Sequence, residues 1–216
     1  MLSLFVSVLV LFFGEVAGLT REYIPGKTSM NWSDAQQYCR RYYRDLATVT
    51  TAEENQRLYA LMGNIVSAWI GMYRGKKYVN IWLWSDQAPS SFFQWNIYQP
   101  SNNMGNQDCV EMEPGGWNDQ FCSANRIFVC YQFIVLVKEK KTWEEAYEYC
   151  RMNYTGLVSA ASETKLQLAE MESGQTQTDS IWTGLRFLNG EWLWVCNLEQ
   201  QEKRQGKVNV EELMAK

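Results

Sequence analysis

An internal repeat is the feature that most restricts the folds open to this chain. Three tryptophan-containing motifs return in the same order, the first of them 111 residues after Trp32. The matching pairs are Trp32-Ser33-Asp34-Ala35 with Trp143-Glu144-Glu145-Ala146, Trp69-Ile70-Gly71-Met72 with Trp182-Thr183-Gly184-Leu185, and Trp82-Leu83-Trp84 with Trp192-Leu193-Trp194. Cys39-Arg40 likewise returns as Cys150-Arg151. Ordered repetition of this kind indicates a second copy of one structural unit, beginning near Phe133.

The second copy is shorter than the first. After Val195 the repeated pattern stops, and the polar, highly charged stretch from Asn197 to Lys216 is typical of a disordered or weakly helical tail. The sequence therefore predicts four segments: residues 1–18, a complete domain over 19–133, a truncated copy over 134–196, and a tail over 197–216. Cys150 and Cys196 could bond to each other, stay free or bridge two chains.

Residues 1–18 read as a secretory signal. Leu2 to Phe13 is a nearly unbroken apolar run of 12 residues, too short to span a bilayer, and Val16-Ala17-Gly18 offers small residues for cleavage. The alternative is a buried N-terminal strand or helix. No other apolar run approaches 18 residues, so a secreted, extracellular protein without a membrane span after signal removal is expected. Six cysteines suit an oxidising compartment, where they allow 15 pairings.

Composition excludes several kinds of function. The formal net charge is −4 without long runs of one sign, which argues against nucleic acid as a partner. The chain has no histidine, which excludes Ser–His and Cys–His nucleophile pairs and His-ligated zinc. With 10 Trp, 12 Tyr and 9 Phe, the sequence favours a β-rich, tightly packed structure. Asn31-Trp32-Ser33 and Asn153-Tyr154-Thr155 are sequons, so Asn31 and Asn153 are candidate glycosylation sites.

The periodicity predicts two helices and a set of short strands in the first domain. One helix is expected over 34–44 with Ser33 as its N-cap and with Ala35, Tyr38, Cys39 and Tyr42 facing the core. A second helix is expected over 52–62. Strands are expected over 22–24, 47–49 (or a turn), 68–72, 81–84, 109–112 and 127–130. The tryptophans of these strands are expected to be core scaffold.

A long loop occupies much of the stretch from Trp95 to Cys130, which Pro100, Pro114 and Gly115-Gly116 punctuate. Its neutral polar side chains are Gln99, Ser101, Asn102, Asn103, Asn106, Gln107 and Asn118. Such side chains offer oxygen ligands to a hard cation, or donor and acceptor pairs to sugar hydroxyls. A merely solvated loop is the simpler interpretation.

The motifs Gln99-Pro100-Ser101 and Trp117-Asn118-Asp119, with Cys109, Cys122 and Cys130, resemble the sugar-binding half of a C-type lectin domain. The resemblance covers nearly all of the chain from residue 19 to Val195. It implies an α+β fold: two helices flanking antiparallel sheets, with a long disulfide-pinned loop, often with a cis proline, and a partial second copy. It also implies the disulfides Cys39–Cys130 and Cys109–Cys122.

The resemblance further implies a calcium and sugar site. Its candidate ligands, matched position by position, are Gln99, Ser101, Gln107, Asn118 and Asp119. Sugar-binding members usually have Glu at the position of Gln107, and here Asp119 is the one clear anion. Because calcium affinity follows the number of anionic oxygens, the site is expected to be weak or empty.

Two kinds of binding function follow from these residues, and residue types alone also allow one kind of catalysis. The first is a secreted C-type-lectin-like protein that binds a glycan or glycoprotein, with calcium as a weak cofactor. The alternative is a calcium-independent module whose loop binds a protein, or a sugar without calcium, supported by Phe92, Phe93, Trp95 and Tyr98. A glycosidase pair of Asp119 with Glu111 or Glu113 is conceivable from residue types alone, but the resemblance gives it no support, so no enzymatic activity is expected.

Overall fold

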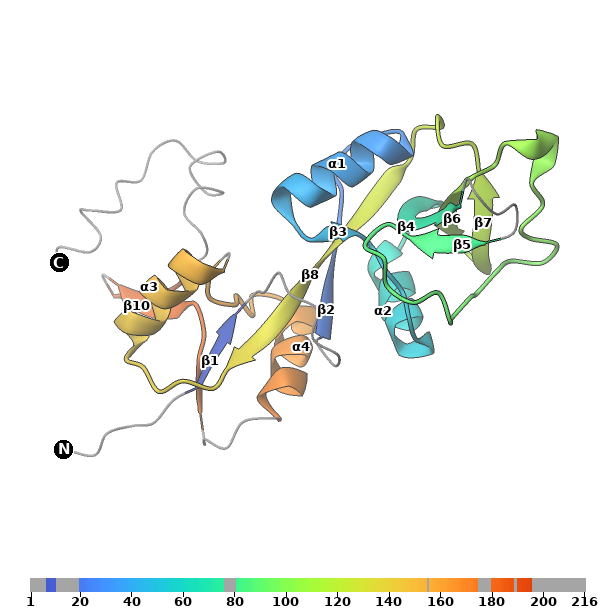
Figure 1. Cartoon of the computed structure of the whole chain (residues 1–216). Coiled ribbons are helices and arrows are strands. Elements are labelled where there is room, and N and C mark those ends of the chain that lie inside the picture. Colours follow the sequence, from blue (N-terminus) through green and yellow to red (C-terminus); the bar gives the residue numbers. More distant parts are fainter. Residues whose placement is uncertain are drawn as a thin grey trace. The chain divides into compact units, whose positions relative to one another are not determined.

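The structure is a computed structural model of the chain, and it describes residues 7–10, 20–75, 81–154, 156–174, 180–188 and 190–195. The chain divides into two compact units (Figure 1). We call residues 23–132 the central unit. We call residues 133–195, with 7–10 and 20–22, the C-terminal unit, and each is described by itself. The rest of the predicted signal, Thr155, Cys196 and the tail lie outside the described residues.

The central unit contains the two expected helices, α1 (Trp32–Tyr42) and α2 (Ala52–Met62). The predicted N-cap of α1 is wrong: the cap is Asn31, whose Oδ1 accepts a 2.9 Å hydrogen bond from the Asp34 N–H. Asparagine caps as well as serine does, and its position one residue before Trp32 lets the helix begin two residues earlier than predicted. The predicted second helix over 52–62 is confirmed, with Thr51 as its N-cap.

The inward face of α1 is narrower than the helical spacing predicted. Ala35 and Cys39 are fully buried, whereas Tyr42 is 40% exposed. Tyr42 is the last residue of α1, because the backbone of Tyr43 is extended and its N–H already donates to the Cys39 carbonyl. The helix thus ends two residues before the predicted boundary, and Tyr42 lies at the rim of the core.

The sheet of the central unit is built on one central strand, β4. The strands are β2 (Thr20–Pro25), β3 (Asp45–Leu46), β4 (Ala68–Arg74), β5 (Trp82–Trp84), β6 (Cys109–Glu113), β7 (Gly116–Gln120) and β8 (Ile127–Val137). β4 pairs antiparallel with β5 and β6, β6 pairs antiparallel with β7, and β4 pairs parallel with the start of β8. Residues 47–49, expected to be a short strand or a turn, have no regular secondary structure, and the two-residue β3 directly before them pairs with β8.

Tryptophans and disulfides form the core of the central unit. Its main cluster consists of Trp32, Ala35, Cys39, Leu46, Trp69, Cys109, Phe128 and Cys130. Both expected disulfides are present: Cys39–Cys130 joins α1 to β8, and Cys109–Cys122 joins β6 to the segment after β7. Trp69, Trp82 and Trp84 are 0%, 7% and 1% exposed, so they are scaffold, as predicted, and Trp117 is fully buried as well.

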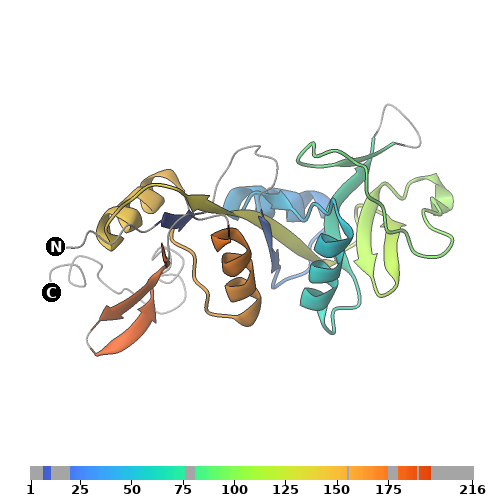
Figure 2. The same ribbon diagram turned by 90° about the horizontal axis from the view of Figure 1, so that it is seen from below.

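The C-terminal unit has a smaller set of elements: β1 (Ser7–Val10), α3 (Trp143–Asn153), α4 (Glu163–Ser173), β9 (Ile181–Trp182), β10 (Leu185–Leu188) and β11 (Glu191–Trp194). A capping box of Thr142 and Glu145 starts α3. β10 and β11 form a two-stranded hairpin, drawn in orange-red in Figure 2. Within the described residues, no helix is long and apolar enough to cross a bilayer.

The repeated motifs make equivalent hydrogen bonds in the two units. Trp32 Nε1 donates to the Ile70 carbonyl at 2.9 Å, and Trp143 Nε1 donates to the Thr183 carbonyl at 3.0 Å. Trp69 Nε1 bonds to Met30 O at 3.0 Å, and Trp182 Nε1 bonds to Lys141 O at 2.9 Å. Gly71 N bonds to Ala47 O at 2.8 Å, and Gly184 N bonds to Val158 O at 2.9 Å.

Candidate functional site

The long loop of the central unit is anchored to β7 by its backbone. Asn96 N donates to the Trp117 carbonyl at 2.8 Å, and Trp117 N donates to the Gln94 carbonyl at 2.7 Å. Gly116 makes this approach possible, because a Cβ there would lie 2.5 Å from the Asn96 nitrogen. The peptide bond before Pro100 is cis, and a single 3₁₀ turn (Asn103–Gly105) follows.

The carboxylate of Asp119 is the centre of the candidate site. Asp119 is fully buried in β7. Its Oδ1 accepts a 2.8 Å hydrogen bond from the Ser101 N–H, and its Oδ2 accepts a 2.7 Å hydrogen bond from the Asn102 N–H. The carboxylate therefore holds the loop by its backbone just after Pro100.

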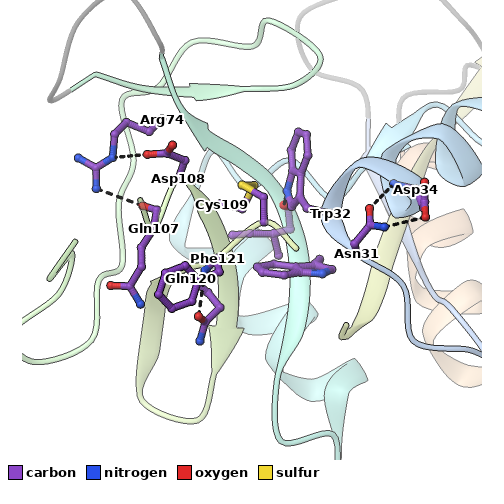
Figure 3. Close-up of a disulfide and its surroundings, with 12 residues drawn as sticks. Asn31, Trp32, Asp34, Arg74, Gln107, Asp108, Cys109, Gln120 and Phe121 are labelled. Atoms are coloured by element: carbon purple, nitrogen blue, oxygen red, sulfur yellow. Dashed lines mark hydrogen bonds and ion pairs between the residues drawn. A yellow bond between two sulfur atoms is a disulfide. The ribbon is translucent and has the colours of Figure 1, made fainter. Parts of the chain in front are cut away.

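Arg74, at the end of β4, supplies positive charge to the same site. Its guanidinium lies 3.3 Å from Asp119 Oδ2 and 3.1 Å from Asp108 Oδ1, and it donates to the Gln107 carbonyl at 3.3 Å. Figure 3 shows Arg74 reaching Gln107 and Asp108. The side chain is 10% exposed and packs 4.4 Å over the Trp82 ring, so its charge is held in place by packing as well as by ion pairs.

The structure brings four of the five predicted ligand positions together. The Gln107 amide oxygen accepts from Ser101 Oγ at 3.2 Å and from the Asn103 N–H. The Gln99 amide oxygen accepts from the Ser101 N–H at 2.8 Å. With Asp119, these side chains form a hydrogen-bonded network inside the loop. Their oxygens are engaged by the chain's own donors.

The fifth position, Asn118, takes part in a separate cluster. Its amide nitrogen donates to Glu111 Oε1 at 3.0 Å, and Gln120 Nε2 donates to the same oxygen at 3.3 Å. Arg126 forms an ion pair with the other oxygen of Glu111, which is 1% exposed. Burial, and next the neighbouring charge of Glu111, raise the pKa of the Glu113 carboxyl. Asp119 and Glu111, which were considered as a glycosidase pair, thus lie in separate clusters, Asp119 paired with Arg74 and Glu111 paired with Arg126.

The residues of the loop do not fit a firmly held calcium ion. Both oxygens of Asp119 already accept hydrogen bonds from backbone N–H groups, and the Arg74 guanidinium forms an ion pair with the same carboxylate. Within the described residues, no group of three or more His, Cys, Asp or Glu side chains could hold a metal ion. A cation entering this network would have to displace an arginine and two backbone donors, each at a cost in free energy.

Sequence patterns did not indicate Arg74 as a site residue. Its contacts with Asp108 and Asp119 join β4 to residues more than thirty positions later in the chain. The one available signal was the charge of Asp108 and Asp119. Two neighbouring carboxylates without a firmly bound metal ion need another cation nearby. The Asn102 N–H was also missed, since a backbone donor leaves no trace in residue type.

The outer surface of the loop is apolar at several points. The exposed fractions are 93% for Tyr98, 84% for Met104 and 77% for Ile97. Phe93 is 42% exposed, whereas Phe92 and Trp95 are half-buried and pack edge-on against Trp117. The loop therefore presents aromatic and aliphatic side chains outward while its polar side chains largely point into their own network.

Comparison with known proteins gives the family. The family model described as "Lectin C-type domain" matches residues 28–132. The C-type lectin BfL-2 of Bungarus fasciatus is 31% identical over 113 residues, which cover 46% of this chain and 69% of the relative. This chain belongs to the C-type lectin family. The assignment confirms the resemblance inferred from the triplets and cysteines.

Other C-type lectins match a similar part of the chain. The CD209 antigen-like protein 2 of Macaca mulatta is 34% identical over 113 residues, which cover 50% of this chain but 43% of that relative. Among solved structures, human lithostathine matches with 25% identity and a TM-score of 0.48, covering 54% of this chain and 98% of that one.

Proposed function

We propose that this C-type lectin is an extracellular binding protein, not an enzyme, whose long loop recognises carbohydrate without a firmly bound calcium ion. The observation that carries the proposal is the position of Arg74. Its guanidinium lies 3.3 Å from Asp119, the one clear anion among the expected calcium ligands, and it also contacts Asp108 and the Gln107 carbonyl. An internal positive charge at this place removes the need for a metal to hold the loop.

The accessible side chains of the loop support a glycan ligand. Asn103 and Asn106 are exposed and carry amide donors and acceptors for sugar hydroxyls. Tyr98 is 93% exposed and offers an aromatic face against which the apolar side of a sugar ring can stack. Calcium would then contribute weakly to affinity.

Recognition of a protein is the second candidate. Ile97 and Met104 are both more than three-quarters exposed on the loop, and aliphatic side chains gain more from contact with a protein surface than with a sugar. A glycoprotein ligand would satisfy both kinds of contact.

The remaining parts of the proposal concern the whole chain. We place it in the extracellular space, with residues 1–18 as the secretory signal and with glycans on Asn31 and Asn153. The two disulfides support an oxidising compartment. We also propose that residues 134–196 are a partial second copy of the domain. The equivalent bonds of Trp32 and Trp143 support this copy.

A glycan array tests the proposed function. The purified protein is applied to mannose-, galactose- and other glycan-terminated probes in millimolar calcium and in EDTA. We expect saturable binding that changes by less than about threefold between the two conditions. Tyr98→Ala should weaken it by about tenfold, whereas Tyr42→Ala, an exposed tyrosine outside the loop, should not.

Two results would go against the proposal. Binding that disappears in EDTA would mean that calcium holds the sugar. Silence on all glycans, with capture of a protein ligand that depends on Ile97 and Met104, would favour the second candidate.

A further inference from the structure

The C-terminal unit contains a short strand, β1, that pairs with a neighbour on each side. Val8, Leu9 and Val10 pair antiparallel with Val137, Leu136 and Val135 of β8. Ser7 and Val8 pair parallel with Ile181 and Trp182 of β9. Figure 1 shows β1 running beside β8. A strand held on both sides is an internal strand of its sheet.

The register of β1 matches that of a strand in the central unit. There, Ile127 and Phe128 at the start of β8 pair parallel with Ala68 and Trp69 of β4. The counterpart of Trp69 in the repeat is Trp182, whose partner is Val8. Val8 therefore takes the position of Phe128, and Ser7 that of Ile127.

A second neighbour gives the same register independently. In the central unit, Gly26 N donates to the Phe128 carbonyl at 2.7 Å. The first motif repeats after 111 residues, so the counterpart of Gly26 is Val137, and Val137 pairs with Val8. Two separate pairings thus assign Val8 to the Phe128 position. By the same count, Val10 stands at the register position of Cys130.

We propose that the C-terminal unit carries a strand-acceptor slot between β8 and β9, and that the chain's own apolar segment Ser7–Val10 is its ligand. The segment would take the role that the closing strand, the first part of β8, plays in the central unit. This inference rests on the proposed second copy of the domain, and it concerns the chain before the proposed secretory signal, residues 1–18, is removed. It adds an interaction site distinct from the loop.

The chemistry of the slot favours an extended apolar segment. Without β1, the backbone groups of Val135–Val137 and of β9 that face the slot would lose their ladder partners, which is costly where they are shielded from water. The flanking strands contribute Ile134, Leu136 and Ile181 to an apolar cluster with Val158, Leu168 and Ala169. A segment with uncharged side chains fits between such strands, and the run from Leu2 to Phe13 is of this kind.

Disulfide trapping tests the register directly. Cys150 is a buried free thiol on α3, at the repeat position of Cys39, which bonds to Cys130 with a Cα–Cα distance of 5.3 Å. A cysteine introduced by Val10→Cys should therefore bond to Cys150. The experiment uses the full chain, refolded so that residues 1–18 remain, in a Cys196→Ser background. Leu9→Cys is the matched control, because neighbouring strand residues point to opposite faces.

Mass spectrometry of non-reduced peptides reads the outcome. We expect the bond between positions 10 and 150 in most molecules of V10C, and only a trace of the corresponding bond in L9C. The Cys39–Cys130 and Cys109–Cys122 bonds report that the central unit has folded. Folded V10C without the new bond, or equal trapping in both variants, would overturn the proposal.

A peptide experiment decides the case if V10C fails to fold. A chain that begins at Leu19 is titrated with a labelled peptide of residues 5–12, and anisotropy is measured. We expect saturable binding, weakened by about tenfold when the peptide carries Val8→Pro, because proline removes a ladder N–H. Equal or absent binding of both peptides would contradict the proposal. Neither readout involves sugar or calcium, so a failure here is distinct from a failure of the loop function.

Discussion

At the scale of single residues, the positive charge of Arg74 compensates the buried negative charge of Asp119. We predict that Arg74→Met, which keeps the packing against Trp82 but removes the charge, destabilises the protein. Asp119 is fully buried and would keep two backbone N–H bonds without a cationic partner. Removing one partner of a buried ion pair costs about 3–5 kcal/mol, and urea unfolding at pH 7 measures the loss.

The same variant should gain a response to calcium. With the guanidinium gone, millimolar calcium should raise the melting temperature of R74M while leaving the wild-type protein unchanged. Arg126→Met is the matched control, because Arg126 also pairs with a buried carboxylate, that of Glu111, but outside the loop. A calcium response equal in R74M and R126M would show that Arg74 has no special place in the site.

The pKa of Glu113 gives a prediction for pH. Burial, and next the charge of Glu111, raise this pKa, so the folded protein favours the protonated carboxyl. The stability from this group is complete below the ordinary pKa of a glutamate. It is lost as the pH rises through the raised pKa. Glu113→Gln should therefore stabilise the protein slightly at pH 7 and leave it unchanged at pH 4.

Thermal unfolding at both pH values checks this prediction, and Glu139→Gln is its control. A hydrogen bond from Lys141 lowers the pKa of Glu139, so the charged form is the favoured one there. E139Q should then have no stabilising effect at pH 7. Stabilisation by both substitutions would point to a general effect of net charge and not to the local burial of Glu113.

At the scale of elements, Gly116 joins β7 to the long loop. A methyl group at this position would meet the Asn96 nitrogen at 2.5 Å and its Cα at 2.7 Å, and backbone atoms move only at a cost. We predict that Gly116→Ala destabilises the central unit by about 2–3 kcal/mol. The Asn96 amide, bonded to Trp117 O, should then exchange its hydrogen faster.

Gly174→Ala provides the comparison for Gly116→Ala. Gly174 follows α4 with helical backbone angles (φ −58°), and a Cβ there would make an ordinary contact at 3.5 Å. This substitution should be neutral or slightly stabilising in the same unfolding assay. A similar loss from both variants would mean that the backbone approach at Asn96 is not what requires glycine.

Elements were predictable from the sequence to the extent that local signals specify them. The helix over 52–62 was predicted from its apolar spacing, a signal that lies within the helix itself, and the structure adds Thr51 as its N-cap. The start of the first helix was misplaced because Asn31 and Ser33 are both good caps. The two-residue strand at Asp45–Leu46 was misplaced because its pairing with β8 depends on residues far away in the chain.

The candidate site was likewise predictable only where local sequence signals specify it. The triplets and the resemblance pointed to Gln99, Ser101, Gln107 and Asp119, which the structure brings into one network. Asn118 instead bonds to Glu111, because neighbours on β7 serve different clusters. Arg74 was absent from the prediction, since its ion pairs form only when β4 and β7 are assembled in one sheet.

At the scale of the whole molecule, apolar composition alone leaves the role of the N-terminal run open. A secretory signal and an internal strand both require little more than uncharged, apolar residues, and the run from Leu2 to Phe13 meets both requirements. The register in which β1 pairs with its neighbours adds information that composition lacks. Val8 pairs with Val137 and with Trp182 at once, a constraint that no single stretch of sequence contains.

The two units should also differ in their dependence on disulfides. Cys39–Cys130 closes a separation of 91 residues and Cys109–Cys122 one of 13, both in the central unit. Loop-closure entropy assigns about 3–5 kcal/mol to each. Among the described residues of the C-terminal unit, no disulfide is present, and Cys150 is a buried thiol. We therefore predict that reduction loosens the central unit and leaves the C-terminal unit as it was.

Hydrogen exchange with and without dithiothreitol measures this difference. Peptides from β4 and β6 should exchange at least about tenfold faster after reduction, because the lost stability is a large part of the net stability of a domain. Peptides from α3 should change little, since their capping box and apolar cluster need no covalent link. If α3 instead loosens together with β6, the C-terminal unit draws its stability from the folded central unit, and the two are one cooperative structure.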